Sequence, residues 1–273
     1  MPVTRALREK VYRHYLAFFE TAERTRRWNL FNDVPWEKLV PGAGNERLAL
    51  CAETFCGVES YLPDYLASHV ELVRGTFGQA WFAANWGYEE SKHALALREY
   101  LVRSGQRTAA QMYDFEERIL GLRWEKPFQT SRQMTIYGAL QEMTTFVIYK
   151  KQEKLAAAEE DQVLATIYRF IARDEMAHTR FYEDMICYHL EEDREGTLAD
   201  LAQVFRHFRM PAADLVPDYA ARVELMRTAG IDRGVFFNQV WAPMLKTLHL
   251  TRHDLPRGWM HEAPGRTAGA DLR

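Results

Sequence analysis

Two copies of a Glu-x-x-His motif are the residues of this sequence whose types and spacing could do chemistry. The first is Glu90 with His93, in NWGYEESKHALAL, and the second is Glu175 with His178, in ARDEMAHTRFY. On an α-helix, residues three positions apart lie on one face, so each glutamate and its histidine can reach a common centre. Carboxylate oxygens and imidazole nitrogens are ligands that suit iron and manganese. Two such spacings by themselves are weak support for a metal site, so the prediction depends on the residues around them.

A single glutamate precedes each motif by about the length of one helix and a turn. Glu59 lies in CGVESYLPDYL, before the first motif, and Glu142 lies in GALQEMTTFVIY, before the second. The chain therefore repeats a unit: a helix with a lone glutamate, a turn, and a helix with Glu-x-x-His. This is the ligand pattern of di-iron and di-manganese carboxylate helix bundles.

All four glutamates fall inside apolar helical stripes that should face a core. Glu142, for example, shares its helix face with Ala139, Phe146 and Tyr149. A buried carboxylate without a partner costs several kcal/mol, so four converging carboxylates need protons, basic partners or cations. Two divalent metal ions would supply four positive charges. The alternative is a set of ordinary interhelical salt bridges with histidines satisfied in the core.

Side chains beside the predicted ligands could hold them in place. Asp174 precedes Glu175, and an acid at that position can accept a hydrogen bond from the free N–H of a ligating imidazole. Thr145, one turn after Glu142, places a hydroxyl near the predicted centre. A solvent-facing acid and a helix-packing threonine are the alternatives. Lys92 is expected to face solvent, and the sequence leaves open whether Glu89 supports a ligand or lies on the surface.

These residues need long helices to position them, and the hydrophobic periodicity predicts an all-α fold. Four long segments are predicted at about residues 46–73, 76–103, 129–158 and 161–190, and each carries one lone glutamate or one motif. The short connections RGTFG and EED imply antiparallel neighbours. Shorter helices are predicted at about residues 5–26, 109–122, 197–209, 212–229 and 232–249. Residues 1–250 are interpreted as one domain, and residues 251–273 as a poorly ordered or surface-draped tail.

The bulk properties exclude several classes of function. The chain has 273 residues and a net charge of −3, which makes a nucleic-acid partner a poor hypothesis. No stretch approaches the ~20 apolar residues of a membrane span, and the N-terminus lacks the apolar run of a secretory signal. The cysteines, Cys51, Cys56 and Cys187, are too few for a disulfide framework and are expected to be small buried hydrophobes. A cytoplasmic location is expected.

At the motifs, the sequence resembles the soluble acyl-acyl carrier protein desaturases, the stearoyl-ACP desaturase family of plant plastids and actinobacteria. The similarity spans roughly residues 25–245 and includes VESYLPDY, EESKH with REYLVRSGQ, LQEMTTF, DEMAHTRFY and FRMPAADL. EESKH replaces the plant-type EENRH, and the C-terminal part is shorter than in plant enzymes. The resemblance implies a ferritin-like four-helix bundle core with additional flanking helices. It also implies that two irons are bound by six residues: Glu59, Glu90, His93, Glu142, Glu175 and His178.

The same resemblance implies roles for three further residues. Thr145 corresponds to the threonine beside the oxygen site. Asp174 and Trp28, the latter in RRWNLFND, resemble the acid and the tryptophan of a proposed electron-transfer route. The Trp28 correspondence is the loosest of the three, because it lies in a loop region.

The activity implied by the resemblance is O2-dependent insertion of a cis double bond into a saturated acyl chain carried on acyl carrier protein. The sequence has neither a dinucleotide-binding glycine fingerprint nor an iron–sulfur cysteine cluster, so a separate ferredoxin is the implied electron donor. A homodimer is expected. The candidates to line an acyl tunnel, which could equally be plain core, are Ala83, Trp86, Gly138, Ala139 and Phe146. Candidates for docking the acidic carrier, which could equally be a solvated surface, are Arg5, Arg8, Lys10, Arg13, Arg24, Arg26, Arg27, Lys150, Lys151 and Lys154.

Three other functions remain compatible with parts of the sequence. Another di-iron oxygenase, which hydroxylates or N-oxygenates a carrier-bound or small-molecule substrate, would use the same ligands. A ferritin-like iron-storage protein would assemble into a cage and would have little use for the helices after residue 195. A metal-free helical interaction module would be excluded by about two irons per chain.

Overall fold

The structure is a computed structural model that describes residues 4–42, 44–211, 215–228 and 236–256. Its regular elements are helices, and the predicted all-α class is confirmed. The α-helices are α1 (Arg5–Thr21), α2 (Glu46–Glu59), α3 (Leu62–Val73), α4 (Phe77–Arg103), α5 (Ala109–Leu120), α6 (Ser131–Ala158), α7 (Gln162–Glu192), α8 (Arg194–His207), α10 (Tyr219–Thr228) and α12 (Ala242–Thr247). The described residues also form two π-helical turns, Ala22–Arg26 and Phe236–Trp241, and a 3-10 turn, Trp36–Lys38.

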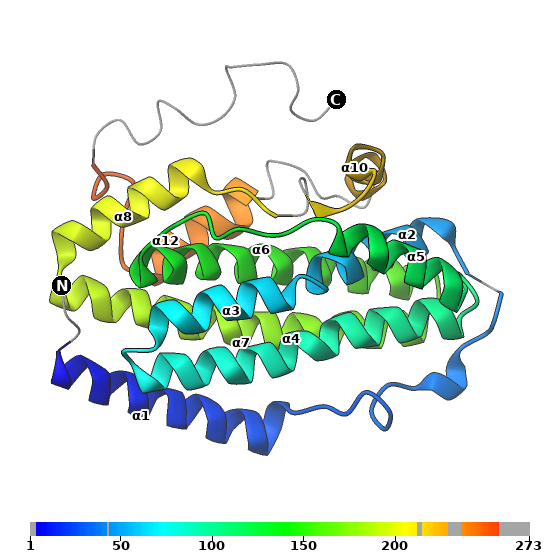
Figure 1. The fold of residues 1–273 in the computed structure, drawn as a ribbon, viewed down its shortest axis with the longest axis horizontal. Coiled ribbons are helices and arrows are strands. Elements are labelled where there is room, and N and C mark those ends of the chain that lie inside the picture. The colour runs from blue at the N-terminus through cyan, green and yellow to red at the C-terminus, as the bar shows by residue number, and fades with distance from the viewer. Residues whose placement is uncertain (1–3, 43, 212–214, 229–235, 257–273) are drawn as a thin grey trace.

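Four helical rods run along the long axis of the molecule and form its centre (Figure 1). One rod is α2 followed by α3, and the others are α4, α6 and α7. Helix α3 joins α4, and α6 joins α7, through three-residue connections, so each pair is antiparallel as predicted. Helix α1 packs against α4 and α7 on one side, while α8 and α12 lie on the opposite side (Figure 1).

Local sequence signals account for the ends of the bundle helices. The side chain of Thr130 accepts a hydrogen bond from the backbone N–H of Gln133 at the start of α6. Asp161 caps α7 in the same way through the N–H of Leu164. These caps satisfy backbone donors that have no partner inside the helix. The observed bounds of α6 and α7, and also those of α4, lie within two residues of the predicted ones.

The predicted long helix at 46–73 is wrong, because the structure divides it into α2 and α3 immediately after Glu59. Pro63 lies near the start of α3 and has no N–H to donate to the preceding turn. The carbonyls at the end of α2 are satisfied by side chains instead: Ser60 donates to the carbonyl of Cys56, and Tyr65 donates to that of Val58. The break places Glu59 at the last residue of α2.

The outer elements also differ from the prediction. The helix predicted at 5–26 ends as an α-helix at Thr21 and continues as the π-helical turn Ala22–Arg26. Residues 212–214 and 229–235, which belong to two predicted helices, lie outside the described residues, as do residues 257–273 of the predicted tail. Within the tail, Leu255 is buried and Asp254 pairs with Arg194, so residues 251–256 pack against the helices.

Candidate metal centre

The six predicted ligands come together from all four central rods. Their ligand atoms form two groups of four, each with its atoms within 4.8 Å of one another. One group is Glu59, Glu90, His93 and Glu175, and the other is Glu90, Glu142, Glu175 and His178. The two groups share Glu90 and Glu175, and every member is buried. Helix α2 contributes Glu59, α6 contributes Glu142, and α4 and α7 each contribute one motif.

The donor atoms fit two divalent metal ions. Nδ1 of His178 faces Oε2 of Glu142 and Oε1 of Glu90, each at 3.1 Å. Nδ1 of His93 lies 3.4 Å from Oε2 of Glu90. Oε1 of Glu90 and Nδ1 of His93 are buried and have no partner in hydrogen-bonding geometry, as expected of atoms reserved for a metal. Four carboxylates and two imidazoles, with two carboxylates shared, are a ligand set for iron or manganese.

Burial and neighbouring charges shift the pKa values of the groups in the centre. Burial, followed by repulsion from Glu90, raises the pKa values of Glu59 and Glu175 well above their usual range. Burial acts the same way on Glu90, but His93 and His178 outweigh it and hold its pKa below the usual value. Burial opposes protonation of His93, yet Glu90 and Asp174 raise its pKa to about 10. Metal ions would displace these protons, so metal binding and proton release are coupled.

The outer nitrogen of each histidine faces an acid from the other motif. Nε2 of His93 lies 3.4 Å from Oδ2 of Asp174, and Nε2 of His178 lies 2.7 Å from Oε2 of Glu89. Arg26 bridges the two acids, with its guanidinium 2.7 Å from Asp174 and 2.9 Å from Glu89. Acids placed in this way fix the orientation and tautomer of a ligating imidazole.

The structure resolves the position of Glu89, which the sequence left open. Its side chain is only 1% exposed and contacts His178, Arg26 and Arg27. A signal for this was present in the sequence, because both motifs have an acid immediately before the glutamate, in EESKH and DEMAH. Comparison of the two repeats would have paired Glu89 with Asp174.

Trp28 lies beside Asp174, where it donates a hydrogen bond from Nε1 to Oδ2 at 2.7 Å. Its ring stacks on Phe170, with a centroid separation of 5.2 Å.

The expectation that Lys92 faces solvent is wrong: its side chain is buried, and its ammonium lies 4.6 Å from the centre of the Trp28 ring. Lys92 is buried because, in the tertiary structure, the segment after α1 covers this face of α4. Burial lowers the pKa of Lys92.

Arg26 and Arg27 do not belong to an exposed carrier-docking patch. Arg26 is 7% exposed and paired as described above, and Arg27 pairs with Glu89 and Glu23. The π-helical turn Ala22–Arg26 shifts the register of the chain at this point, and such turns are frequent at functional sites. The sequence offered no local sign that these cations turn inward, since the buried acids that they contact, Glu89 and Asp174, are more than 60 residues away in the chain.

Three further side chains hold the predicted carboxylate ligands. Thr145 donates to Oε2 of Glu175 at 2.7 Å. Trp86, which the sequence suggested as a tunnel residue, donates from Nε1 to Oε1 of Glu142 at 3.1 Å. Tyr149, which the sequence marks only as an apolar-face neighbour of Glu142, donates its hydroxyl hydrogen to Oε1 of Glu59.

A small cavity of about 30 Å³ adjoins Glu142. Among the predicted tunnel residues, Trp86 and Gly138 line it, whereas Ala83 and Ala139 are fully buried and Phe146 lines a separate groove. The remaining lining is mostly aromatic and polar, with one methionine: Tyr65, His69, Trp124, Met134, Tyr137, Gln141 and Tyr182. This volume holds about one water molecule, so a longer guest requires these side chains to move.

The sequence matches a family described as fatty acid desaturase over residues 48–249. The chain is 31% identical over 182 residues to a protein of Mycobacterium tuberculosis named "Putative acyl-[acyl-carrier-protein] desaturase DesA2", with 64% of each chain covered. It is 31% identical over 146 residues to the chloroplastic stearoyl-acyl carrier protein 9-desaturase 2 of Arabidopsis thaliana, covering 50% of this chain and 36% of that protein. These matches span less than two thirds of either relative.

Solved structures share the fold. The X-ray structure of DesA2 from Mycobacterium tuberculosis aligns with a TM-score of 0.59 and 20% identity, covering 90% of this chain and 100% of that chain. An R2-like ligand-binding oxidase variant with a Mn/Fe cofactor aligns with a TM-score of 0.57 and 16% identity, covering 89% and 93%. The predicted ferritin-like bundle is thereby confirmed. None of the described helices has the length and apolar character that a membrane span requires.

Proposed function

The chain belongs to the fatty acid desaturase family, and on that premise we propose that it is a di-iron, O2-dependent desaturase of acyl chains carried on acyl carrier protein. The observation that carries the proposal is the pair of buried four-residue groups that share Glu90 and Glu175. The reaction would remove one hydrogen from each of two adjacent carbons and leave a cis double bond. With two electrons and two protons from outside, O2 would be reduced to two molecules of water.

The protein residues would hold and orient the metal centre. Glu59 and His93 would bind one iron, Glu142 and His178 would bind the other, and Glu90 and Glu175 would be shared. Two irons bound there would supply the activation of O2 that C–H cleavage requires. Tyr149, Thr145 and Trp86 each fix a ligand carboxylate by a hydrogen bond, which leaves its remaining oxygen turned toward the centre.

Electrons would reach the centre through Trp28, Asp174 and His93. The indole of Trp28 hydrogen-bonds to Asp174, and the same carboxylate oxygen faces Nε2 of His93. This chain of contacts links the segment after α1 to a predicted iron ligand. A separate ferredoxin is the proposed donor.

The acyl chain would enter beside Glu142, where the small cavity touches the centre. Trp86, Tyr182 and His69 are in ring contact there, so their rearrangement would determine the space available to the substrate. For docking of the acidic carrier protein, Arg5, Arg8 and Lys154 remain exposed candidates. Lys10, Arg13, Arg24 and Lys150 each pair with a glutamate, which reduces the charge that they offer.

A specific observation also supports the oxygenase alternative. The cavity beside Glu142 is small and includes the polar side chains of His69 and Gln141. A saturated acyl chain forms no hydrogen bonds with such groups, whereas a short or polar substrate could hydrogen-bond to them. Hydroxylation or N-oxygenation of such a substrate is therefore the second candidate function.

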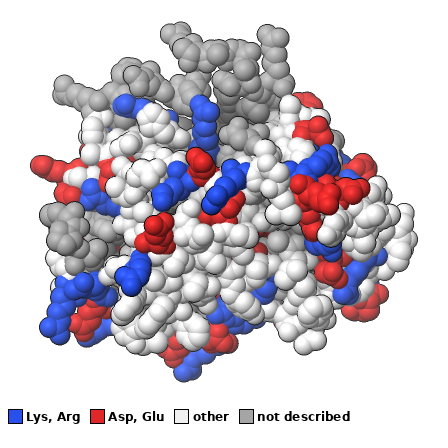
Figure 2. All heavy atoms as spheres, in the orientation of Figure 1, with Lys and Arg blue, Asp and Glu red and all other residues white. Residues whose placement is uncertain are grey.

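We further propose a homodimer formed through α1 and α4. Several large apolar side chains of these helices are exposed: Tyr12, Leu16, Phe19, Phe77, Trp81, Tyr88 and Leu95. Trp81 stacks on Phe77 and contacts Tyr12 edge-on, so these rings form one cluster. Figure 2 shows an uncharged area over the region of α4, bordered by charged side chains. Contiguous exposed apolar surface of this kind is typical of protein interfaces.

The test is incubation of iron-loaded protein with a series of acyl carrier protein thioesters, O2 and a ferredoxin reducing system. Mass spectrometry of the acyl group should detect loss of two hydrogens, and the matched Glu142→Ala protein should produce none. Insertion of oxygen would favour the oxygenase alternative. Absence of any acyl product from fully iron-loaded protein would refute the proposed function.

A further inference from the structure

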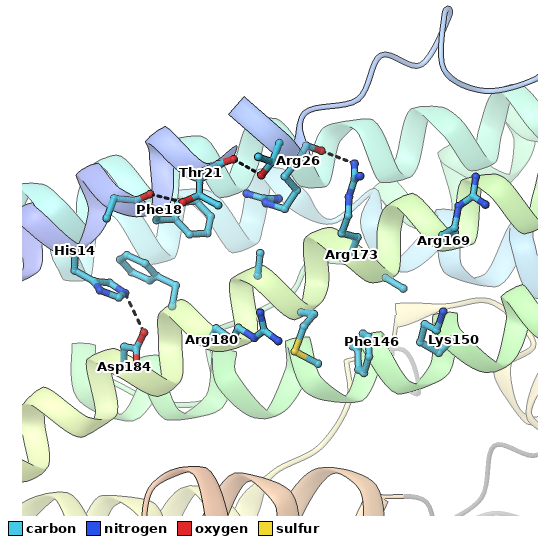
Figure 3. Close-up of a pocket in the computed structure, with 16 residues that line it drawn as sticks. His14, Phe18, Thr21, Arg26, Phe146, Lys150, Arg169, Arg173, Arg180 and Asp184 are labelled. Atoms are coloured by element: carbon cyan, nitrogen blue, oxygen red, sulfur yellow. Dashed lines mark hydrogen bonds and ion pairs between the residues drawn. The ribbon is translucent and has the colours of Figure 1, made fainter. Parts of the chain in front are cut away.

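A groove separate from the predicted metal ligands lies on the outside of the bundle, between α1, α6 and α7 (Figure 3). Its volume is about 700 Å³, within the range of sites that bind organic ligands. The side chains that line it come from all three helices and from the π-helical turn after α1. Figure 3 shows those of α1 and α7 turned toward one another across it.

The floor of the groove is apolar. Phe18 of α1, Phe146 of α6, and Met176 and Phe181 of α7 line it together with small alanines. Phe18, Phe146 and Met176 are half-buried, so their side chains retain a face that an apolar chain could cover. Burial of methylene groups on such a surface stabilises a complex in proportion to chain length.

The rim of the groove is cationic. Arg169, Arg173 and Arg180 are four and seven positions apart, so they follow one face of α7, and all three are exposed. Within the described residues, none of the three has a carboxylate at ion-pair distance. Asp184, the acid that lines the groove, pairs with His14. The rim thus offers guanidinium groups to an external anion.

We propose that this groove binds a long-chain amphipathic anion, with its apolar tail along the phenylalanine and methionine floor and its carboxylate or phosphate head at Arg169 and Arg173. An apolar floor alone would suit a neutral lipid, and arginines alone would suit an inorganic anion. Their combination along one groove fits a ligand that has both parts. Guanidinium groups bind both carboxylate and phosphate heads through paired hydrogen bonds.

Occupation of the groove would be coupled to the metal centre through Arg26. This residue lines the groove, and its guanidinium holds Asp174 and Glu89, the acids behind the two histidines. Arg173, at the rim, donates a hydrogen bond to the backbone carbonyl of Arg26. An anionic head at Arg173 would therefore compete for a group that positions Arg26.

The proposal is tested by calorimetric titration of the full-length protein, below micelle concentrations, with four probes: dodecanoate, dodecyl phosphate, octanoate and dodecyltrimethylammonium. The expected result is one saturable site per chain for the two C12 anions, with binding of octanoate, which has four fewer methylene groups, weaker by roughly tenfold or more. The cation of equal chain length should bind at least tenfold more weakly than the C12 anions. Comparison of dodecanoate with dodecyl phosphate identifies the preferred head group.

Variants locate the site. The double variant Arg169→Gln/Arg173→Gln should weaken binding of the C12 anions by about tenfold or more, and Ala17→Trp, which fills the groove from α1, should abolish it. The matched control Arg118→Gln/Arg123→Gln removes two exposed arginines elsewhere and should change nothing. Unchanged affinity in the groove variants, equal binding of the cation, or absence of saturable binding would each overturn the proposal. The titration measures ligand binding and does not depend on enzymatic turnover. Failure of ligand binding is therefore distinguishable from failure of the proposed reaction.

Discussion

Nε2 of His178 lies 2.7 Å from Oε2 of Glu89, the acid that immediately precedes Glu90 in the other Glu-x-x-His motif. The reciprocal contact joins His93 to Asp174, which precedes Glu175. Each motif therefore supplies the acid that orients the histidine of the other. Arg26 connects the two acids, so α4, α7 and the turn after α1 are held in one buried polar network.

Loss of charge at Glu89 should weaken metal binding without removing a ligand. In Glu89→Gln, the side chain keeps its shape but no longer supports the basicity of His178, and metal affinity should fall by about 10- to 100-fold. Chelator competition measures this affinity directly. Glu99→Gln, on the same helix but paired with Arg103 near the surface, is the control and should retain full affinity. Equal affinities in both variants would contradict the role of Glu89.

Removal of a predicted ligand should remove metal itself. Glu142→Ala or His178→Ala should reduce metal from two ions per chain to at most one and lower turnover by roughly 100-fold or more. Metal content is measured by mass spectrometry of the digested protein. Glu153→Ala, on the same helix as Glu142 but paired with Lys150, is the control. Full occupancy and activity in the ligand variants would refute the assignment.

Trp28 should affect the delivery of electrons rather than the binding of iron. Trp28→Phe keeps an aromatic ring against Phe170 but loses the hydrogen bond to Asp174. Steady-state turnover with a ferredoxin system should fall about tenfold, the effect of one hydrogen bond on a barrier. A single turnover after chemical reduction should match the unaltered protein, and iron content should be unchanged. An equal loss in both assays would place Trp28 in a structural role.

Glu183 should make the protein less stable as pH rises. Burial raises the pKa of this α7 carboxyl to about 7, above its usual value near 4.5. Between these values the folded chain binds more protons than the unfolded chain, so the free energy of unfolding falls with increasing pH. Glu183→Gln should not show this loss. Between pH 5 and pH 8, the free energy of unfolding of the variant should therefore rise by on the order of 2 kcal/mol relative to that of the unaltered protein. Urea unfolding of both proteins at the two pH values, with equal metal content, checks the difference. A variant whose stability follows that of the unaltered protein at both pH values would count against it.

The proposed dimer should depend on Trp81. Trp81→Asp places a charge within the exposed aromatic cluster of α1 and α4, and the dimer dissociation constant should rise by about 30-fold or more. Light scattering during size-exclusion chromatography across a dilution series measures it. Tyr113→Asp, at an exposed aromatic on α5, is the control. A dimer that resists Trp81→Asp would place the interface elsewhere.

The ligand pattern and most of the central helices were predictable from the sequence because they follow local rules. The i, i+3 spacing puts Glu90 with His93 and Glu175 with His178 on one helix face, whatever surrounds them. The caps Thr130 and Asp161 mark the starts of α6 and α7 through contacts within a few residues. The break after Glu59 could also have been predicted from the local sequence, because Pro63 lies just after it.

Contacts between distant segments were decided only by the tertiary structure. Lys92 is a charged residue on a helix, and its inward position depends on Trp28, 64 residues away, covering that face. Arg26 looks like part of a basic surface run until the fold brings Asp174, 148 residues away, to its guanidinium. A charged side chain is buried only where charged or polar partners compensate for the water that it loses, and here those partners are distant in the sequence. The sequence alone predicted which residues could bind metal, and the packing of α1, α4 and α7 decided which charged side chains lie behind them.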